Sequence, residues 1–353
     1  MNLNQVEKIA EAVLYEGYML YPYRPSSVKN QQRWNFGVLC PTSYSAQQEG
    51  TERDTMQTEI LVRGNSGTRL TVKVRFLQII RRSIGKLHVP VTSLLPGTEP
   101  PFDYVDRLEV GGRIYQAWQE AAEREIVCEP IELALPVASA SIPFSFSAHR
   151  EVEPLRGEAG DIVGIMVREW EHLSGSIEIS ETHLCDDLFK IRVLVRNDSH
   201  FAATSEALRE EAVLYSLVST HTILGVEDGA FLSLLEPPAE YETLVAECKN
   251  IGTWPVLVGE DDSQQAMLSS PIILYDYPQI APESPGNLFD GTEIDEILAL
   301  RILTLTDDEK NEMRNADERS RQILERTESI PAEHFMKLHG VLRGLRPADE
   351  ERP

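Results

Sequence analysis

His183 and Cys185 form the best local pair of metal ligands in the sequence. On a strand, residues two apart point to the same side, so this imidazole and thiolate could share a zinc ion. Zinc would need one or two further ligands, such as Cys128 or His149. A strand end followed by an acidic turn explains the pair without a metal. We therefore assign no metal or cofactor and keep His183 and Cys185 as candidates.

Two other groups of ligand-type residues are weaker. The acidic residues between 290 and 296 could bind a hard cation, but acids at a helix start also interact favourably with the helix dipole. His334 and His339 are five residues apart, so on a helix their side chains diverge by roughly 140°. Neither group is assigned a metal.

The sequence lacks the motifs of common enzymes. It contains no GxxxxGK[ST] phosphate loop, no GxGxxG, no GxSxG and no HExxH. We predict no catalytic residues. This favours a role other than catalysis.

The densest group of aromatic and arginine side chains lies between residues 15 and 34. Aromatic residues and arginine are the usual anchors of protein interfaces. An internal aromatic corner packed on a sheet is the alternative, and both hold if half the rings face outward. The candidate partner-binding residues are Tyr18, Tyr21, Tyr23, Arg24, Arg33 and Trp34.

Charge is distributed unevenly along the chain. The 33 Lys and Arg against 57 Asp and Glu give a net charge of −24, yet residues 1–90 carry +5. The basic residues Lys73, Arg75, Arg81 and Arg82 are expected on the solvated face of a sheet. The acidic total argues against nucleic acid as a ligand, because phosphate binding needs a concentrated basic surface.

Compartment follows from the cysteines and the N-terminus. Cys40, Cys128, Cys185 and Cys248 are too scattered for a disulfide framework. No run of 18 apolar residues exists, so we expect no membrane span. Without a basic segment followed by an apolar one at the start, we expect a cytoplasmic protein with reduced thiols.

Periodicity predicts the secondary structure. Residues 3–16 have the 3–4 spacing of an amphipathic helix. Alternating residues predict hairpins at 58–63 with 70–76 and at 107–115, the second turning at Gly111-Gly112. Further strands are expected at 124–135, 141–148, 162–170, 175–182 and 188–196, the last two as a pair.

The pattern becomes more helical after residue 197. A helix is expected over 204–217, a second at 238–248, and short apolar runs between 221 and 275 as strands. Thr306-Asp-Asp-Glu309 is a capping box that opens one charged helix to about residue 328. A last helix is expected to start near Pro331.

These elements predict an α+β fold, with an antiparallel, β-rich, sandwich- or barrel-like domain and a helical C-terminal region. We divide the chain into an N-terminal helix and aromatic segment packing on the main domain (1–56), a β-rich domain (57–200), a mixed α/β segment (201–277), a linker (278–290) and C-terminal helices (291–346).

Four stretches of sequence resemble a known family: residues 13–30, 33–38, 269–278 and 284–297. The family consists of uncharacterised proteins encoded beside genes for uptake-type nickel–iron hydrogenases. The chain lacks the two CxxC motifs of the large subunit, the many cysteines of the small subunit and the phosphate loop of the nickel-inserting GTPase. Asn2 also stands where the usual small nickel chaperone has histidine.

The resemblance therefore implies a non-catalytic accessory or assembly protein that acts by protein–protein binding. Hydrogenase subunits or maturation factors would be the partners, and a homo-oligomer is compatible with the sequence. Two alternatives remain open. One is a metal-dependent enzyme that uses His183 and Cys185, and the other is a structural component of a larger particle.

Overall fold

Strands form most of the computed structural model, and helices lie around them. The β-rich α+β fold class is thus confirmed, including helices near the C-terminus. The structure describes residues 3–14, 35–95, 98–133, 139–185, 187–202, 208–260, 263–279, 302–316 and 318–329.

A five-stranded antiparallel sheet forms one layer. The predicted pairing of 175–182 with 188–196 is confirmed, with Ile179 opposite Val193. In order, the strands are β14 (Ala230–Phe231), β1 (Thr55–Arg63), β12 (Leu188–Asn197), β11 (Leu173–Cys185) and β8 (Ser139–Phe146).

A nine-stranded sheet forms the second layer, and its central strand is β2 (Arg69–Val91). On one edge β2 pairs first with β13 (Leu217–Glu227) and then with β10 (Ile162–Trp170). On its other edge lie β7 (Ile131–Glu132), β6 (Trp118–Val127) and β3 (Phe102–Val105). The sheet ends in β16 (Ala266–Ser270) and β15 (Trp254–Leu257) beyond β13, and in β9 (His149–Arg156) beyond β10.

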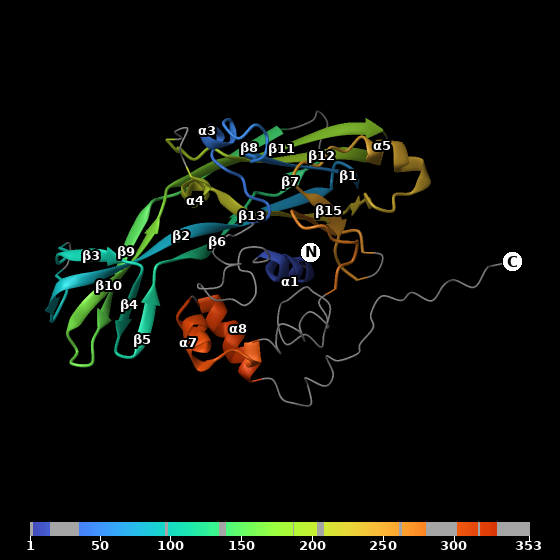
Figure 1. Cartoon of the computed structure of the whole chain (residues 1–353). Helices are drawn as coiled ribbons and strands as arrows, with labels where there is room; N and C mark the ends of the chain where they lie inside the picture. Colours follow the sequence, from blue (N-terminus) through green and yellow to red (C-terminus); the bar gives the residue numbers. More distant parts are fainter. Residues whose placement is uncertain are drawn as a thin grey trace.

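The 23-residue strand β2 joins two parts of the molecule. Its first half lies in the sandwich of the two sheets. Its second half runs into an arm together with β3, β9 and β10, as Figure 1 shows. Because β13, β15 and β16 come from residues 201–277, that segment shares the nine-stranded sheet with β2.

The sandwich encloses the main apolar core. Val72, Val74 and Phe76 point inward from β2, and the Phe76 ring lies 5.9 Å from the Phe146 ring and 6.1 Å from the Phe144 ring, both on β8. Burial of such aromatic and aliphatic surface is the main force that holds the two layers together.

The arm has two smaller cores. The hairpin β4 (Arg107–Val110) and β5 (Arg113–Gln116) covers Ile84 on one face, while Phe102 packs near Leu87 on the other. The predicted turn at Gly111-Gly112 is confirmed. Both glycines have positive φ, +55° and +73°, as a two-residue hairpin turn requires.

The hairpin predicted from 58–63 and 70–76 is wrong. β1 pairs with β12 in one sheet and β2 pairs with β13 in the other, so the turn between them crosses from layer to layer. Thr68 Oγ1 stabilises this crossing, because it accepts from Asn65 N and donates to Asp228 O. Turn residues mark a change of direction but do not specify the next partner.

Most helices are short. The helix expected over 204–217 is reduced among the described residues to α4 (Arg209–Ala212) and the 3-10 turn η1 (Val213–Tyr215), because β13 starts at Leu217. Before the C-terminal part, the structure also contains α1 (Asn4–Leu14), α3 (Thr42–Ser45), the 3-10 turn η2 (Ala239–Tyr241) and α5 (Glu242–Ala246).

The charged helix expected from Asp307 to about residue 328 is two helices, α7 (Asp307–Ala316) and α8 (Glu318–Glu328). The capping box is confirmed, since Glu309 N donates to Thr306 Oγ1 and Thr306 N donates to Glu309 Oε2. Arg314 and Lys310 pair with Glu328, so α8 folds back along α7. The helix expected near Pro331 lies outside the described residues.

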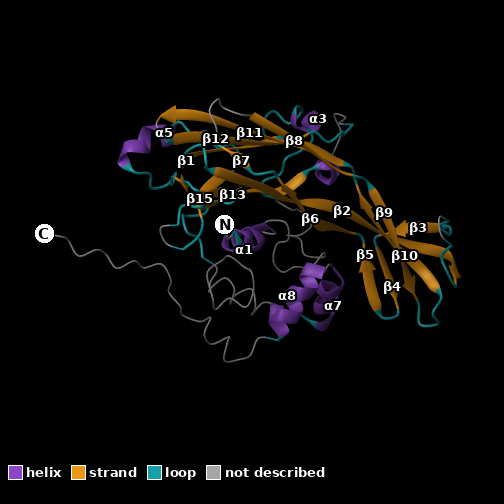
Figure 2. Cartoon of the chain, turned by 180° about the vertical axis from the view of Figure 1, so that it is seen from behind, coloured by secondary structure: helices purple, strands orange, loops and turns teal. Residues whose placement is uncertain are grey.

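Helices α1, α7 and α8 lie on the same side of the nine-stranded sheet, away from the five-stranded sheet (Figure 2). We call this side the helix face. In the part of the chain that the structure describes, no helix combines the length and the apolar character needed to cross a membrane.

Candidate functional site on the helix face

The two metal-ligand candidates lie at the end of β11. His183 is half-buried, with its ring 5.0 Å from that of Phe189, while Cys185 is exposed. The register with β12 shifts between them, and such a bulge breaks the alternation on which their shared side depended. Among the described residues, no group of three or more His, Cys, Asp and Glu side chains is placed to hold a metal ion.

The further ligands suggested from sequence lie elsewhere. Cys128 is in the sandwich core, where burial raises the pKa of its thiol to about 11. His149 is on β9 with its ring 5.2 Å from that of Trp170, near the opposite end of β11 from His183. The acidic residues at 290–296, His334 and His339 lie outside the described residues.

The six candidate partner-binding residues, from Tyr18 to Trp34, also lie outside the described residues, but the structure describes both flanks of their segment. On one side α1 ends at Leu14, and on the other the chain resumes at Asn35. Leu14 and Val38 belong to the same buried cluster. The described residues on either side of the segment are thus packed at one place on the helix face.

Helix α1 is held on this face by its apolar stripe. Val6, Ile9 and Val13 pack with Ile223 of β13 and with Leu268 of β16. Every third or fourth residue is apolar, so one side of the helix is buried and the other carries charge. Glu7 on the charged side pairs with Lys73 of β2.

A groove of about 460 Å³ runs beside α1. Its walls carry both positive and negative side chains. The prediction that Lys73 and Arg75 lie on a solvated face of the sheet is wrong. Their side chains are only 19 % and 14 % exposed, because helices cover this face. The lining residues are Asn4, Glu7, Lys8, Glu11, Lys73, Arg75 and Glu125.

Arg75 is shared by two carboxylates of β6. Its Nη2 lies 2.9 Å from Glu123 Oε2, and its Nε lies 3.7 Å from Glu125 Oε2. Both glutamate side chains are about two-fifths exposed. One guanidinium therefore faces two acids, and a negative charge remains at this edge of the groove.

A buried histidine lies next to Arg75. His221 on β13 is opposite Arg75, is fully buried, and its Nδ1 is 2.7 Å from the carbonyl oxygen of Ser219. Burial lowers the pKa of His221 to about 4, and the Arg75 charge acts in the same direction. The ring is therefore neutral at pH 7 and serves the packing of the face.

β13 has a bulge where the returning chain meets it. Ser219 has φ +54°, and the register with β2 shifts between Val218 and His221. The bulge turns Ser219 N towards Phe36 O and Thr220 N towards Gly37 O. These hydrogen bonds fix the residues that directly follow the aromatic and arginine segment to the sheet.

Large apolar side chains are exposed at this attachment and in the chain that follows Pro271. Phe36 is 46 % exposed, and a Cβ on Gly37 would lie 2.6 Å from Pro271 Cβ, so the two segments are in contact. Beyond Pro271, Ile273 is 70 % and Tyr275 is 84 % exposed. Phe36 is the exposed aromatic side chain at the attachment itself, and aromatic residues are among the types that anchor protein interfaces.

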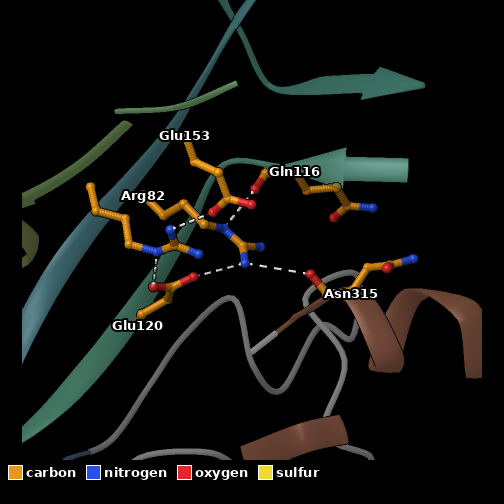
Figure 3. Close-up of polar contacts among 6 residues, drawn as sticks. Arg82, Gln116, Glu120, Glu153 and Asn315 are labelled. Atoms are coloured by element: carbon orange, nitrogen blue, oxygen red, sulfur yellow. Dashed lines mark hydrogen bonds and ion pairs between the residues drawn. The ribbon is translucent and has the colours of Figure 1, made fainter. Parts of the chain in front are cut away.

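The joint between sandwich, arm and C-terminal helices contains a network of charges (Figure 3). Glu120 of β6 binds Arg82 through one oxygen at 2.9 Å and Arg168 through the other at 2.7 Å, and Arg168 also binds Glu153. Arg82 donates further to the backbone oxygens of Gln116 and Asn315. Its side chain is 4 % exposed, not solvated as expected.

Asn315 is in the last turn of α7, where free carbonyl groups attract a cation. Arg82 thereby connects the sheet with the helices. Sequence reasoning missed this role, although Arg81-Arg82 inside an apolar run was a signal that one arginine would be buried. Neither a protein-family model nor a curated protein matches this chain.

Proposed function

We propose that this protein is a non-catalytic accessory or assembly protein that binds another protein through the helix face. The observation that carries the proposal is the position of Leu14 and Val38 in one cluster. It brings both ends of the aromatic and arginine segment to one place, next to exposed Phe36. The segment contains the residue types that anchor interfaces.

The family resemblance supplies the proposed partners, which are hydrogenase subunits or maturation factors. The net charge of −24 and the basic balance of residues 1–90 support a partner site whose charge differs from that of the remaining surface. Affinity purification from the native host, with mass spectrometry of the bound proteins, identifies the partner. Recovery of none of these proteins would contradict the hydrogenase assignment.

Arg24→Ala tests the segment itself. An interface anchor of this type costs on the order of 2 kcal/mol when truncated, so partner binding should weaken about 30-fold while the melting temperature stays nearly constant. Lys29→Ala is the matched control, because it removes the same charge from the same segment. A large loss of stability with intact binding by the folded fraction would show that Arg24 belongs to an internal corner.

A further inference from the structure

The outer edge of an edge strand carries backbone groups without a partner strand. The strand orders of the two large sheets end in four edge strands, and three of them contain a proline whose nitrogen points outward. In an antiparallel pair, hydrogen-bonding residues alternate along each strand, so every second residue points its N–H and C=O away from the neighbour. On β11, the backbone carbonyl of Ser174 accepts a hydrogen bond from Asp198 N on the β12 side. The backbone groups of Gly175 and Ile177 therefore point the other way, towards β8. Pro143, opposite Ser176, therefore points its nitrogen outward.

The same reasoning applies to the two ends of the nine-stranded sheet. On β9, Gly157 bonds towards Asp161, so the odd-numbered residues face β10 and Pro154 faces outward. On β15, Val258 bonds to β16, so Pro255 faces outward. Proline cannot donate a hydrogen bond, and it protects an edge against the addition of another strand. The fourth end, β14, is two residues long.

β6 has a different edge. Cys128 N bonds to Val72 O of β2, so the even-numbered residues of β6 face β2 and the odd-numbered ones face outward. Ala117 N confirms this alternation because it bonds outward to Asp106 O. Among the described residues, no strand pairs with the outward side of Ala121–Val127, and these residues include no proline.

The open edge of β6 is acidic on the helix face. Glu123 and Glu125 point to that face, where they share Arg75, and Glu125 also lines the groove beside α1. If two copies of β6 paired with each other antiparallel about this point, Glu123 of one copy would lie opposite Glu125 of the other. Like charges on opposed strands repel, whereas opposite charges stabilise a pair. This edge is thus disfavoured for self-association and favourable for a basic strand.

We propose that Ala121–Val127 of β6 is a docking edge for an extended, basic segment of a partner protein, which adds a strand to the nine-stranded sheet. Its main chain would pair with the outward groups of Ala121, Glu123, Glu125 and Val127. Its basic side chains would lie beside the two glutamates. On the other face its side chains would lie beside Ala122 and Ile126, which suits apolar residues. The residues of this edge are different from those of the segment invoked in the proposed function.

A blocked heptapeptide that alternates lysine and valine is the probe, with a fluorescent label and anisotropy as the readout. Glu123→Pro removes one outward N–H without removing a hydrogen bond to β2. Glu123→Ala is the matched control, since both variants lose the ion pair with Arg75 and only one loses the donor. We expect binding to Glu123→Pro at least tenfold weaker than to Glu123→Ala, and no binding of a heptapeptide that alternates glutamate and valine.

Hydrogen exchange of the full chain locates the contact. The peptide should slow exchange of the Ala121, Glu123, Glu125 and Val127 amides and leave those of β8 unchanged. The proposal is overturned if the peptide binds both Glu123 variants equally, if it does not bind the unchanged protein, or if these four amides are already protected without it. The last result would mean that another part of the chain or a second copy occupies the edge.

Discussion

The sandwich and the arm are built on the same strand, β2, but they cover its two faces differently. In the sandwich, Phe76 is packed against Phe144 and Phe146 of a second sheet. In the arm, the small two-stranded sheet β4–β5 covers Ile84, and Leu87 packs near Phe102 on the other face.

The joint between the two parts is filled with charge instead of hydrocarbon. Arg82, Glu120, Arg168 and Glu153 satisfy one another there. Buried ion pairs gain little net stability, because removing the charges from water offsets their attraction. We therefore expect the sandwich to supply most of the stability, while the joint fixes the direction in which the arm and the C-terminal helices lie.

The largest expected effect tests the sandwich. Phe76→Ala removes a fully buried ring, and such a change lowers the free energy of unfolding by about 3–5 kcal/mol. Chemical denaturation measures this loss. Phe102→Ala in the arm is the control and should cost less, because Phe102 is only half-buried. Equal losses would remove the distinction between the two regions.

A substitution in the joint should lower the free energy of unfolding by less than Phe76→Ala, and its effect should stay close to the joint. Glu120→Gln keeps the shape but removes the charge that two arginines share, so we expect a loss of about 2–3 kcal/mol. Hydrogen exchange should show faster opening of β9, β10 and α7, with β12 and β13 unchanged. Glu123→Gln, at an exposed glutamate on the same strand, should change stability by less than about 0.5 kcal/mol. Uniform destabilisation of the whole chain would contradict a local role.

Acid should lower the stability of the protein through the buried His221. Its folded-state pKa of about 4 lies below the unfolded value of 6.5, so the unfolded chain takes up a proton first as the pH falls. The free energy of unfolding should decrease by about 2 kcal/mol between pH 7 and pH 5 from this group alone. The stabilisation is fully present only above pH 6.5. Denaturation at several pH values should show a flatter profile for His221→Gln, and identical slopes would contradict the prediction.

The smallest effect on stability is expected at the edge of the sandwich. Pro143→Val supplies the missing outward N–H of β8 and should change the free energy of unfolding by less than about 1 kcal/mol. It should instead promote association at high concentration, which analytical ultracentrifugation detects. Ser141→Val is the control, because it adds a similar side chain where the outward N–H already exists. Equal behaviour of the two variants would show that Pro143 does not guard the edge.

Periodicity was sufficient to predict most strands, because alternation reports a face that is buried. The β10 prediction of 162–170 coincides with Ile162–Trp170, and the β4–β5 turn follows from two adjacent glycines. The partner of β1 could not be predicted in this way. Its residues 56–62 are all buried, and the turn at Gly64–Gly67 fits a hairpin and a crossing between layers equally well.

The identity of the edge strands could have been predicted from the sequence. Proline inside a strand pattern indicates an edge strand, and Pro143, Pro154 and Pro255 all lie in such patterns. The apolar run around Arg81-Arg82 indicated that one arginine would be buried, but the partners of Arg82 could not be predicted, because they come from strands and a helix that are distant in sequence. The bulge between His183 and Cys185 likewise depends on the register with β12.

The length of β2 has a consequence for how the chain reaches this structure. About 125 residues separate Val91 from the start of its neighbour β13, which at a synthesis rate of about 5–20 residues per second corresponds to roughly 6–25 s. Throughout that interval one edge of a long, apolar strand has no partner from its own chain. The first half of β2 is thus the segment most exposed to misassociation before synthesis is complete, and the one for which a nascent-chain chaperone would matter most.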